Sequence, residues 1–466
     1  MNILFASPEV VPFAKTGGLA DVAGSLPKEL AREGQAVKVI LPFYKSVKNL
    51  DLSLKPKKIG SFAFLTYEDS GIEYVFVVND KYYDRDALYG DKTGDYPDNY
   101  LRFSYYAKSI VEFALHSGFK PDIIHLNDWQ TGLVPIYLKM ENSPIKTLFT
   151  IHNIAYQGLF KNSVLKDISV PRDFYHINGI EYYNKISFLK AGIIYSTAIS
   201  TVSKKYSEEI LTTEFGCGMD GILKTRAHDL YGILNGVDYK DWDPRNDKYI
   251  AEKYGPETIG GKVFCKKDLI NASGLLEDTI ERPLIGVISR LAEQKGIDLL
   301  AEAARDIVNA GASIIILGTG DEKYNKICAD LADEFPGRVA SLIKFDNALA
   351  HKIEAGSDFF AMPSRYEPCG LNQLYSLRYG TLPIVRATGG LDDTITDLYA
   401  DPENGNGIKF QDATKDALIE AVKRGIALYQ KRDTWHSTLR RIMGLDYSWQ
   451  RSATFYRELY SKLINK

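Results

Sequence analysis

Short apolar runs alternate with longer amphipathic stretches along most of this 466-residue chain. In the first half, stretches with helical spacing of apolar residues occur at residues 19–33, 99–117 and 183–191. The short apolar runs around them lie at residues 2–6, 37–42, 74–78, 122–125, 147–151, 198–202 and near Ile233. Buried runs of this kind that alternate with helices predict parallel strands in a doubly wound α/β sheet.

The same alternation starts again after the polar segment 238–246, with strands predicted at residues 284–289, 313–317, 339–343, 359–362 and 383–385. We therefore predict two Rossmann-like domains that face a deep cleft, residues 1–240 and residues 241–446. The last segment, residues 447–466, has a candidate helix cap at Ser448, followed at helical spacing by Trp449, Phe455, Tyr456, Leu459 and Tyr460. We expect a helix that packs back toward the N-terminal domain.

Charge and cysteine content exclude several classes of partner. The chain has 57 basic and 60 acidic residues, a net charge of −3, so no global positive field favours nucleic acid or an anionic membrane. Its cysteines form no CxxC pair, which favours a reducing compartment and argues against structural zinc. The first residues lack the basic region of a signal peptide, and the uncharged windows are shorter than a bilayer span. We expect a cytoplasmic protein.

Residues 362–379, MPSRYEPCGLNQLYSLRY, predict a turn that leads from a strand into a helix. Free backbone N–H groups and the helix dipole converge at such a loop, which suits a phosphate or a sugar. An ionised Glu367 can accept hydrogen bonds from two neighbouring sugar hydroxyls, while the amides of residues 370–372 face an anion. Taken alone, the stretch also fits an ordinary strand-to-helix turn.

Three cations lie in similar loops. Lys15 precedes two glycines between the first strand and its helix, which is a phosphate-loop design without the GxGxxG or Walker spacing. Arg290 and Lys295 follow the first strand of the second half and together can neutralise a diphosphate. For each loop the alternative is a turn with solvated side chains, although the strand-end position of Arg290 and Lys295 favours function.

Two polar clusters end neighbouring strands of the first half. Asp128 lies in HLNDWQT and His152 in TIHN, so both side chains are expected to face the cleft. The DxD triplet at residues 84–86 matches a metal-binding pattern, but its charged, tyrosine-rich surroundings favour a solvated loop. No nucleophile-elbow pattern supports a hydrolase triad.

Six motifs in order make the chain similar to bacterial glycogen synthases and plant starch synthases: KTGGLADV, HLNDWQT, TIHN, LNGVD, SRLAEQKG and PSRYEPCGLNQLYSLRYGTLPIV. The resemblance spans nearly the whole chain and includes the closing helix YSWQRSATFYRELY. It implies the glycosyltransferase-B fold and transfer of glucose from ADP-glucose to the non-reducing 4-hydroxyl of an α-1,4-glucan. It also implies retention of anomeric configuration, with no metal and no cofactor besides the sugar-nucleotide substrate.

The resemblance also implies residue roles. The catalytic set is His152, Asp128, Glu367, Arg290 and Lys295. Donor binding involves Arg290 and Lys295 together with Lys15, Gly17, Gly18, Asn235, Cys369, Gly370, Leu371 and Asn372. Tyr89 and Asp21 are sugar or acceptor contacts. The chain departs from the wider fold at Tyr375, where many retaining enzymes have a second glutamate, and at Asn372, where bacterial relatives commonly have threonine.

Other functions remain open at this point. A transferase that uses UDP-glucose, or a sucrose-type enzyme, would share the fold and differ in the base pocket. Paired Rossmann domains would also serve a dinucleotide-dependent oxidoreductase, although the missing GxGxxG and ribose-binding acid count against it. A non-catalytic glucan-binding protein would have no need of the cations. The sequence leaves open the donor base, the acceptor length, the oligomeric state, allosteric control and the mechanism of retention.

Overall fold

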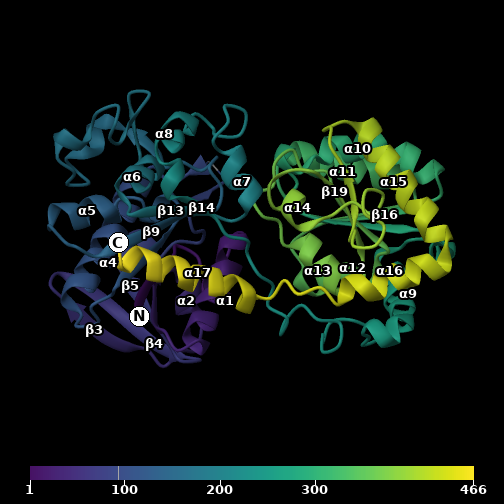
Figure 1. Cartoon of the computed structure of the whole chain (residues 1–466), viewed down its shortest axis with the longest axis horizontal. Coiled ribbons are helices and arrows are strands. Elements are labelled where there is room, and N and C mark those ends of the chain that lie inside the picture. Colours follow the sequence, from purple (N-terminus) through teal and green to yellow (C-terminus); the bar gives the residue numbers. More distant parts are fainter. Residues whose placement is uncertain (93) are drawn as a thin grey trace. The chain divides into compact units, whose positions relative to one another are not determined.

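The computed structural model describes residues 1–92 and 94–466, which form two compact units. Unit 1 consists of residues 1–236 and 449–466, and unit 2 of residues 237–448 (Figure 1). Each unit is built around a sheet with helices on its faces. None of the helices in these described ranges is both long and apolar enough to cross a membrane.

Unit 1 contains a nine-stranded sheet of order β14-β13-β9-β8-β1-β2-β5-β4-β3. Its strands are β1 (Asn2–Ala6), β2 (Ala36–Pro42), β3 (Lys55–Ile59), β4 (Phe62–Asp69), β5 (Ile72–Val78), β8 (Ile123–Asn127), β9 (Lys146–Ile151), β13 (Ala198–Thr201) and β14 (Leu230–Gly232). Small antiparallel pairings add β6 (Gly90–Asp91) with β7 (Gly94–Asp95), and β10 (Leu159–Lys161), β12 (Lys185–Ser187) and β11 (Glu181–Tyr182). The helices are α1 (Gly18–Arg32), α2 (Lys45–Lys48), α3 (Asp80–Tyr83), α4 (Asn99–His116), α5 (Val134–Met140), α6 (Phe188–Tyr195), α7 (Lys204–Glu209), α8 (Asp220–Thr225) and α17 (Trp449–Ile464).

The strand order of unit 1 reverses between β1 and β8, which pair in parallel with Phe5 opposite His125. On the other side of β1, β2 pairs in parallel with Phe5 opposite Val39. In an open α/β sheet, the carboxyl ends of the strands on either side of such a reversal form the usual ligand site. The antiparallel strands β3 and β4 were not predicted, because β3 (KPKKI) is mostly exposed and lacks an apolar run.

The helix predicted at residues 183–191 is wrong in its first half. Tyr183 and Asn184 have positive φ angles of 46° and 63° and form the turn between β11 and β12. The helix begins only at Phe188, because the Ser187 side chain accepts a hydrogen bond from Lys190 N and caps it.

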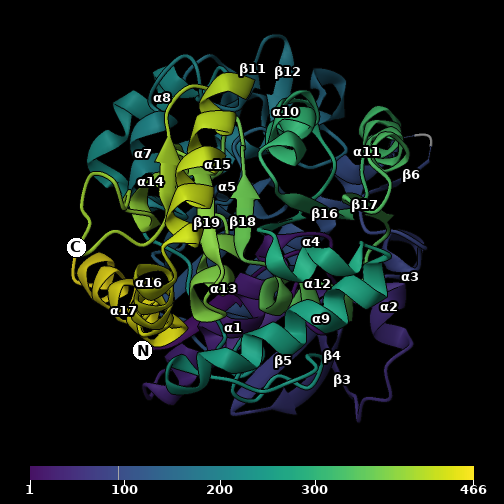
Figure 2. The same cartoon turned by 90° about the vertical axis from the view of Figure 1, so that its right-hand side faces the viewer.

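Unit 2 has a six-stranded parallel sheet of order β17-β16-β15-β18-β19-β20. The strands are β15 (Leu284–Ile288), β16 (Ser313–Gly318), β17 (Val339–Ile343), β18 (Phe359–Met362), β19 (Leu382–Arg386) and β20 (Ile408–Phe410). Its helices are α9 (Lys262–Ser273), α10 (Ile297–Asn309), α11 (Glu322–Glu334), α12 (Asn347–Gly356), α13 (Asn372–Arg378), α14 (Gly389–Thr394), α15 (Lys415–Gln430) and α16 (Arg432–Met443). Numbered from β15, this order is the 3-2-1-4-5-6 of a Rossmann sheet, with the reversal between β15 and β18. Figure 2 shows α10, α11 and α15 on one side of this sheet and α9, α12 and α13 on the other.

Helix α17 packs against α1 in unit 1 (Figure 1). Its Tyr460 is fully buried, and the Tyr460 hydroxyl lies 2.6 Å from Nδ1 of His125. Nε2 of the same ring lies 2.6 Å from Thr150 Oγ1. Both ring nitrogens are therefore occupied, and His125 of the HLNDWQT motif anchors the last helix to the sheet.

Candidate active site

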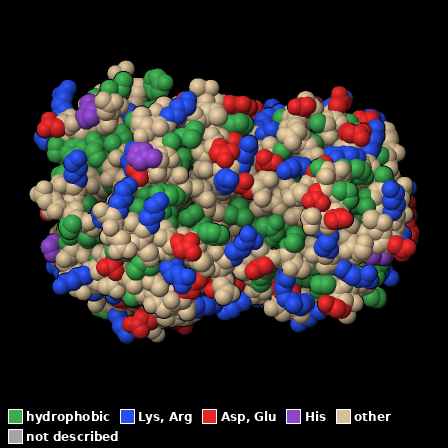
Figure 3. Space-filling model, in the orientation of Figure 1, with side chains coloured by type: hydrophobic (Ala, Val, Ile, Leu, Met, Phe, Trp, Pro, Cys, Tyr) green, Lys and Arg blue, Asp and Glu red, His purple; other side chains and the backbone are tan. Residues whose placement is uncertain are grey.

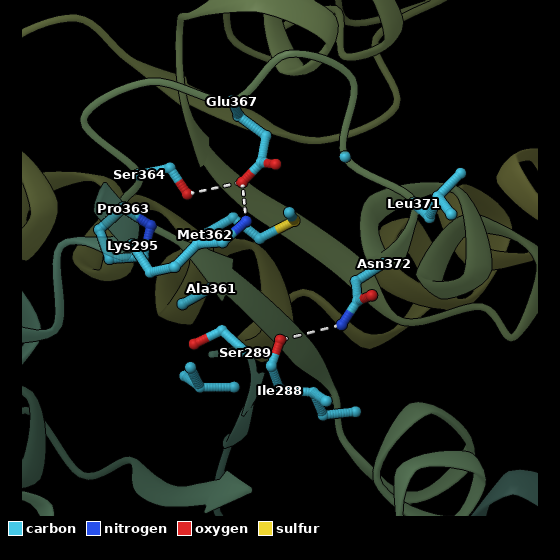
Figure 4. Close-up of a pocket in the computed structure, with 12 residues that line it drawn as sticks. Ile288, Ser289, Lys295, Ala361, Met362, Pro363, Ser364, Glu367, Leu371 and Asn372 are labelled. Carbon is cyan, nitrogen blue, oxygen red and sulfur yellow. Dashed lines mark hydrogen bonds and ion pairs between the residues drawn. The ribbon is translucent and has the colours of Figure 1, made fainter. Parts of the chain in front are cut away.

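A pocket lies at the strand-order reversal of unit 2, at the carboxyl ends of β15 and β18 (Figure 4). It is lined by Val287, Ile288, Ser289, Lys295, Ala361, Met362, Pro363, Ser364, Glu367, Gly370, Leu371 and Asn372. The sheet therefore brings together two segments that are about seventy residues apart in the chain.

Glu367 is the polar centre of this pocket. Its Oε2 lies 2.6 Å from Lys295 Nζ and accepts a hydrogen bond of 3.0 Å from Ser364 Oγ (Figure 4). Glu367 is only 6% exposed, so the ion pair compensates a carboxylate that water hardly reaches. Within the described part of the chain no hydrogen bond to Oε1 is found, and this oxygen can accept from a ligand hydroxyl.

Backbone contacts hold the two loops of the pocket together. Gln294 O accepts from Arg365 N at 2.8 Å, and Gln294 Nε2 donates to Tyr366 O at 3.2 Å. Gly296 has φ 66°, and a Cβ at this position would lie 2.1 Å from Pro363 O. Only glycine allows this close approach. The loop that contains Lys295 (the lysine loop) is therefore held against the loop that contains Glu367 (the glutamate loop).

The start of α13 forms the remaining wall. Gly370 has φ 73° and precedes Leu371, the N-cap of the helix. Asn372 Nδ2 donates to Ile288 O at 3.0 Å and ties the first turn to β15 (Figure 4). The N–H groups of a first turn have no acceptors within the helix, so they are available to an anion.

Two predicted residues of this unit lie outside the pocket lining. Arg290 is exposed and donates to Gln294 Oε1 at 3.0 Å. Cys369 is buried, and its carbonyl oxygen accepts from Gln373 Nε2 at 3.1 Å. The structure therefore brings together Lys295, Glu367 and residues 370–372, while the Arg290 side chain contacts Gln294 and Cys369 contacts Gln373 through its backbone.

A glycine pair that the sequence analysis missed supports the glutamate loop from behind. Gly389 has φ 46°, and a Cβ there would lie 2.0 Å from Glu367 O. Gly390 N donates to the same carbonyl oxygen at 3.1 Å. The available signal in the sequence was two consecutive glycines shortly after β19, which ends at Arg386.

In unit 1, the loop of Lys15, Gly17 and Gly18 joins β1 to α1. Lys15 Nζ lies 2.7 Å from Asp21 Oδ1, within the same loop-to-helix segment. Gly17 and Gly18 are exposed, and Gly17 is the N-cap of α1. These four predicted residues therefore form one local group at the carboxyl end of β1.

Glu9, which was not predicted, organises this loop. It is 4% exposed and accepts hydrogen bonds from Thr16 N (2.5 Å), Thr16 Oγ1 (2.6 Å) and Gly17 N (3.2 Å). Tyr89 OH donates to Glu9 Oε1 at 2.7 Å, so the predicted sugar contact Tyr89 is joined to the same carboxylate. The signal in the sequence was a single carboxylate in the apolar context PEVVPF, just after the first strand.

Asp128 and His152 meet at the carboxyl ends of β8 and β9, next to the strand-order reversal of unit 1. Asp128 has φ 56° and ψ 177°, a conformation that non-glycine residues adopt only under constraint and that is concentrated at functional sites. Its Oδ1 accepts from His152 N at 2.8 Å. Burial raises the pKa of Asp128 to about 7 and lowers the pKa of His152 to about 3.

The raised pKa predicts how pH acts on stability at Asp128. Between its ordinary pKa of 3.8 and about 7, the folded protein holds a proton that the unfolded chain has released. The free energy of unfolding should therefore fall as pH rises through this window, and Asp128→Asn should remove that contribution. Because Asp128 is partly exposed, we expect a reduced effect. Between pH 4.5 and 8, the free energy of unfolding of the variant should rise by roughly 2 kcal/mol relative to that of wild type.

Urea-induced unfolding of both proteins at a series of pH values measures this difference. Asp51→Asn, at an exposed position of the same unit, is the control and should show no such trend. A constant difference between wild type and Asp128→Asn across the pH range would contradict the prediction.

The remaining predicted positions are also placed. Asn235 is 5% exposed, and its Oδ1 is buried without a hydrogen-bond partner among the described residues.

The acids of the DxD triplet form surface ion pairs, Asp84 with Lys48 at 3.0 Å and Asp86 with Lys45 at 2.6 Å. In residues 1–92 and 94–466, no cluster of three or more His, Cys, Asp or Glu side chains is arranged to hold a metal ion. On the face in Figure 3, acidic and basic side chains are interspersed.

Two family models match this chain, one within unit 1 and one within unit 2. The family model "Starch synthase catalytic domain" matches residues 2–225, and "Glycosyl transferases group 1" matches residues 277–441. These two matches identify the chain, with its two Rossmann-like units, as a glycosyltransferase. Glycogen synthase of Geotalea daltonii is 43% identical over 484 residues, which cover 100% of this chain and 99% of the relative. Glycogen synthase of Myxococcus xanthus is 44% identical over 100% of both chains, and this chain belongs to the glycogen synthase family.

Solved structures give the same result. The catalytic domain of starch synthase IV from Arabidopsis thaliana, bound to ADP and acarbose, matches with a TM-score of 0.91 and 31% identity, over 100% of this chain and 99% of that one. Sucrose-phosphate synthase from Thermosynechococcus elongatus matches in fold, with a TM-score of 0.63 and 17% identity over 99% of both chains. The predicted family and the glycosyltransferase-B fold are confirmed.

Proposed function

We propose that this protein is a glycogen synthase that transfers glucose from ADP-glucose to the non-reducing 4-hydroxyl of an α-1,4-glucan with retention of configuration. The observation that carries the proposal is the paired Glu367 and Lys295 at the strand-order reversal of unit 2. This pair offers a carboxylate for sugar hydroxyls next to a cation for a phosphate, within a chain that matches glycogen synthases over its full length.

In this proposal, unit 2 binds the donor. Lys295, the exposed Arg290 and the free N–H groups of residues 370–372 bind the diphosphate, and Glu367 Oε1 accepts from the glucose hydroxyls. Phe345, which is 78% exposed after β17, stacks on the base. Cys369 contributes through its backbone, because its side chain is buried.

Unit 1 is assigned to the acceptor side and to the reacting sugar. Lys15, with Gly17 and Gly18, reaches the donor phosphates, and Asp128 and His152 contact the glucose that is transferred. Asn235 offers its unpaired, buried Oδ1. Tyr89 and Asp21 are proposed as sugar or acceptor contacts, each joined to the loop after β1.

The reaction breaks the bond between C1 of glucose and the β-phosphate oxygen and forms a bond between C1 and the acceptor O4. The acceptor hydroxyl proton goes to the departing phosphate oxygen on the same face of the sugar, so atoms and charge balance without a protein nucleophile. Fixed cations stabilise the negative charge that develops on the diphosphate, and the His152 carbonyl oxygen faces the oxocarbenium-like carbon. No metal or cofactor takes part, and the enzyme acts in the cytoplasm.

Nucleotide release from ADP-glucose and from UDP-glucose, each with glycogen and excess EDTA, tests the function. Wild type is expected to release ADP only when glycogen is present, and Glu367→Gln is expected to abolish this release. Glu293→Gln, an exposed glutamate beside Lys295, is the matched control and should retain activity. Release of UDP alone would change the donor, and release of neither nucleotide would overturn the proposal in favour of a glucan-binding protein.

Mass spectrometry of Asp128→Ala during turnover tests the route of retention. The proposal predicts that no glycosyl-enzyme adduct accumulates. A covalent adduct on any carboxylate would replace front-face departure with double displacement.

Glu9→Gln is expected to raise KM for the sugar nucleotide at least about tenfold, with a smaller effect on kcat. Glutamine is neutral and has one acceptor oxygen where Glu9 has two, so the charge-assisted hydrogen bonds from Thr16, Gly17 and Tyr89 are weakened. Initial-rate kinetics measure the change, with the exposed Glu68→Gln as control. An unaltered KM would show that the loop keeps its conformation without the carboxylate.

A further inference from the structure

Asn127 is the last residue of β8 and lies at the reversal between β1 and β8 in unit 1. Its side chain is fully buried, and Nδ2 donates to Ala6 O, the last carbonyl of β1, at 3.0 Å. A carbonyl oxygen can only accept, so the NH₂ group must face Ala6. The orientation of the amide is thereby set, and its oxygen faces the opposite way.

The amide oxygen of Asn127 meets the ring of His152. Oδ1 lies 2.9 Å from Nε2, and because an amide oxygen only accepts, Nε2 must carry a proton. Burial keeps the ring neutral at physiological pH, since it lowers the pKa of His152 to about 3. A neutral imidazole has one proton, so Nδ1 bears a lone pair, and no described residue hydrogen-bonds to it.

Two consecutive residues thus hold the same histidine. Asn127 holds the ring, and Asp128 holds the backbone by accepting from His152 N at 2.8 Å. Side chains of successive residues in a strand point to opposite faces, and the unusual φ of 56° at Asp128 ends that alternation. With this conformation, Asn127 and Asp128 contact the ring and the backbone of the same histidine.

The charged and titratable groups nearby leave this arrangement intact. The Asp128 carboxylate contacts the backbone of His152 rather than its ring. His125 lies on the same strand as Asn127, but burial lowers its pKa well below the ordinary value and both its nitrogens are hydrogen-bonded. The Glu9 carboxylate accepts hydrogen bonds from Thr16, in the loop before α1.

We propose that Asn127 is a positioning residue that fixes the Nε2-protonated tautomer of His152, so that Nδ1 is presented to the ligand as a hydrogen-bond acceptor. The partner of Nδ1 is then a hydroxyl group, which can donate, and a carboxylate or carbonyl group is rejected there. This inference rests on the proposed function for the identity of the hydroxyl as that of a sugar. The tautomer itself does not depend on it.

Long-range ¹H–¹⁵N NMR of protein labelled at histidine reads the tautomer directly. The chain has seven histidines, and the signal of His152 is the one lost in His152→Asn. In wild type without ligand, we expect a neutral ring with the proton on Nε2. A proton on Nδ1, or a charged ring at neutral pH, would overturn the proposal.

Asn127→Leu removes the acceptor while roughly keeping the side-chain volume. We expect part of the His152 population to move its proton to Nδ1, and kcat for glucosyl transfer to fall about tenfold to a hundredfold. Thr131→Val is the matched control, because Thr131 Oγ1 donates to the carbonyls of Asn127 and Asp128 without touching the histidine ring. It should cost stability and leave both the tautomer and kcat unchanged.

Asn127→Ala serves the same purpose if Asn127→Leu does not fold. An unchanged tautomer in these variants, or an altered tautomer with unchanged kcat, would overturn the role of Asn127. If wild type transfers no glucose, the proposed function fails, whereas the spectrum of wild type still decides the tautomer. The two failures are therefore distinguishable.

Discussion

Replacing Lys295 by methionine is expected to lower kcat/KM for ADP-glucose by about a hundredfold to a thousandfold, the usual effect of removing one fixed charge-stabilising group. In the proposed mechanism, no cation at this position would then stabilise the departing diphosphate. Glu367, 2.6 Å away and 6% exposed, would also lose its partner. Because Lys295 is itself partly exposed, we expect a loss in unfolding free energy on the order of 2 kcal/mol.

Steady-state kinetics and urea unfolding measure the two effects, and a double-mutant cycle with Glu367→Gln separates them. In the cycle, the stability loss of Lys295→Met should largely disappear once Glu367 is neutral, since no buried charge is left unpaired. Lys344→Met is the control, because its pair with Asp346 is exposed and should contribute little. Equal stability losses in both backgrounds would contradict a direct coupling of the pair.

Gly389→Ala is expected to lower kcat/KM by about a hundredfold, although residue 389 lines no part of the pocket. The added Cβ would lie 2.0 Å from Glu367 O, a backbone atom that cannot yield without moving the loop. Misplacement of a positioned group by about 1 Å commonly costs a factor of this size. The left-handed φ of 46° adds about 1 kcal/mol of strain for any side chain.

Gly274→Ala is the matched control, because it also has a left-handed φ, of 72°, but its Cβ would meet nothing within 4 Å. It should reproduce the backbone strain and leave catalysis intact. Kinetics of both variants, with thermal unfolding to measure stability, make the comparison. Full activity in Gly389→Ala would mean that the glutamate loop tolerates displacement.

The elements and site residues that follow from short, contiguous stretches of sequence were predictable. Strands 339–343 and 359–362 have the predicted bounds, because a continuous apolar run between turn residues leaves little alternative. Glu367 and residues 370–372 could be selected for the same reason, since strand, turn and helix follow one another directly. Lys295 was also selected from its position after a strand, and the sheet then brought it beside Glu367.

The supporting residues were not predictable in this way. Glu9, Asn127 and Gly389 act through contacts with Tyr89, Ala6 and Glu367, partners that lie 80, 121 and 22 positions away in the chain. The half-exposed hairpin of β3 and β4 was also not predicted, because an edge strand with lysines has no run of buried apolar residues. The turn at residues 183–184 was mistaken for helix because periodicity alone does not register a positive φ.

The sequence by itself determined the order of strands and helices, the family and the residue types at the strand ends, because these follow from local apolar patterns and contiguous motifs. Only the tertiary structure decided which strand ends meet, and with them the partner of each polar group. A buried hydrogen bond or ion pair depends on distances of about 3 Å between atoms from different strands, and strand order is set by packing of the whole sheet. For that reason the position of Glu367 in a strand-to-helix loop could be predicted from its own segment, whereas the tautomer that we propose for His152 depends on Ala6, at the end of a neighbouring strand.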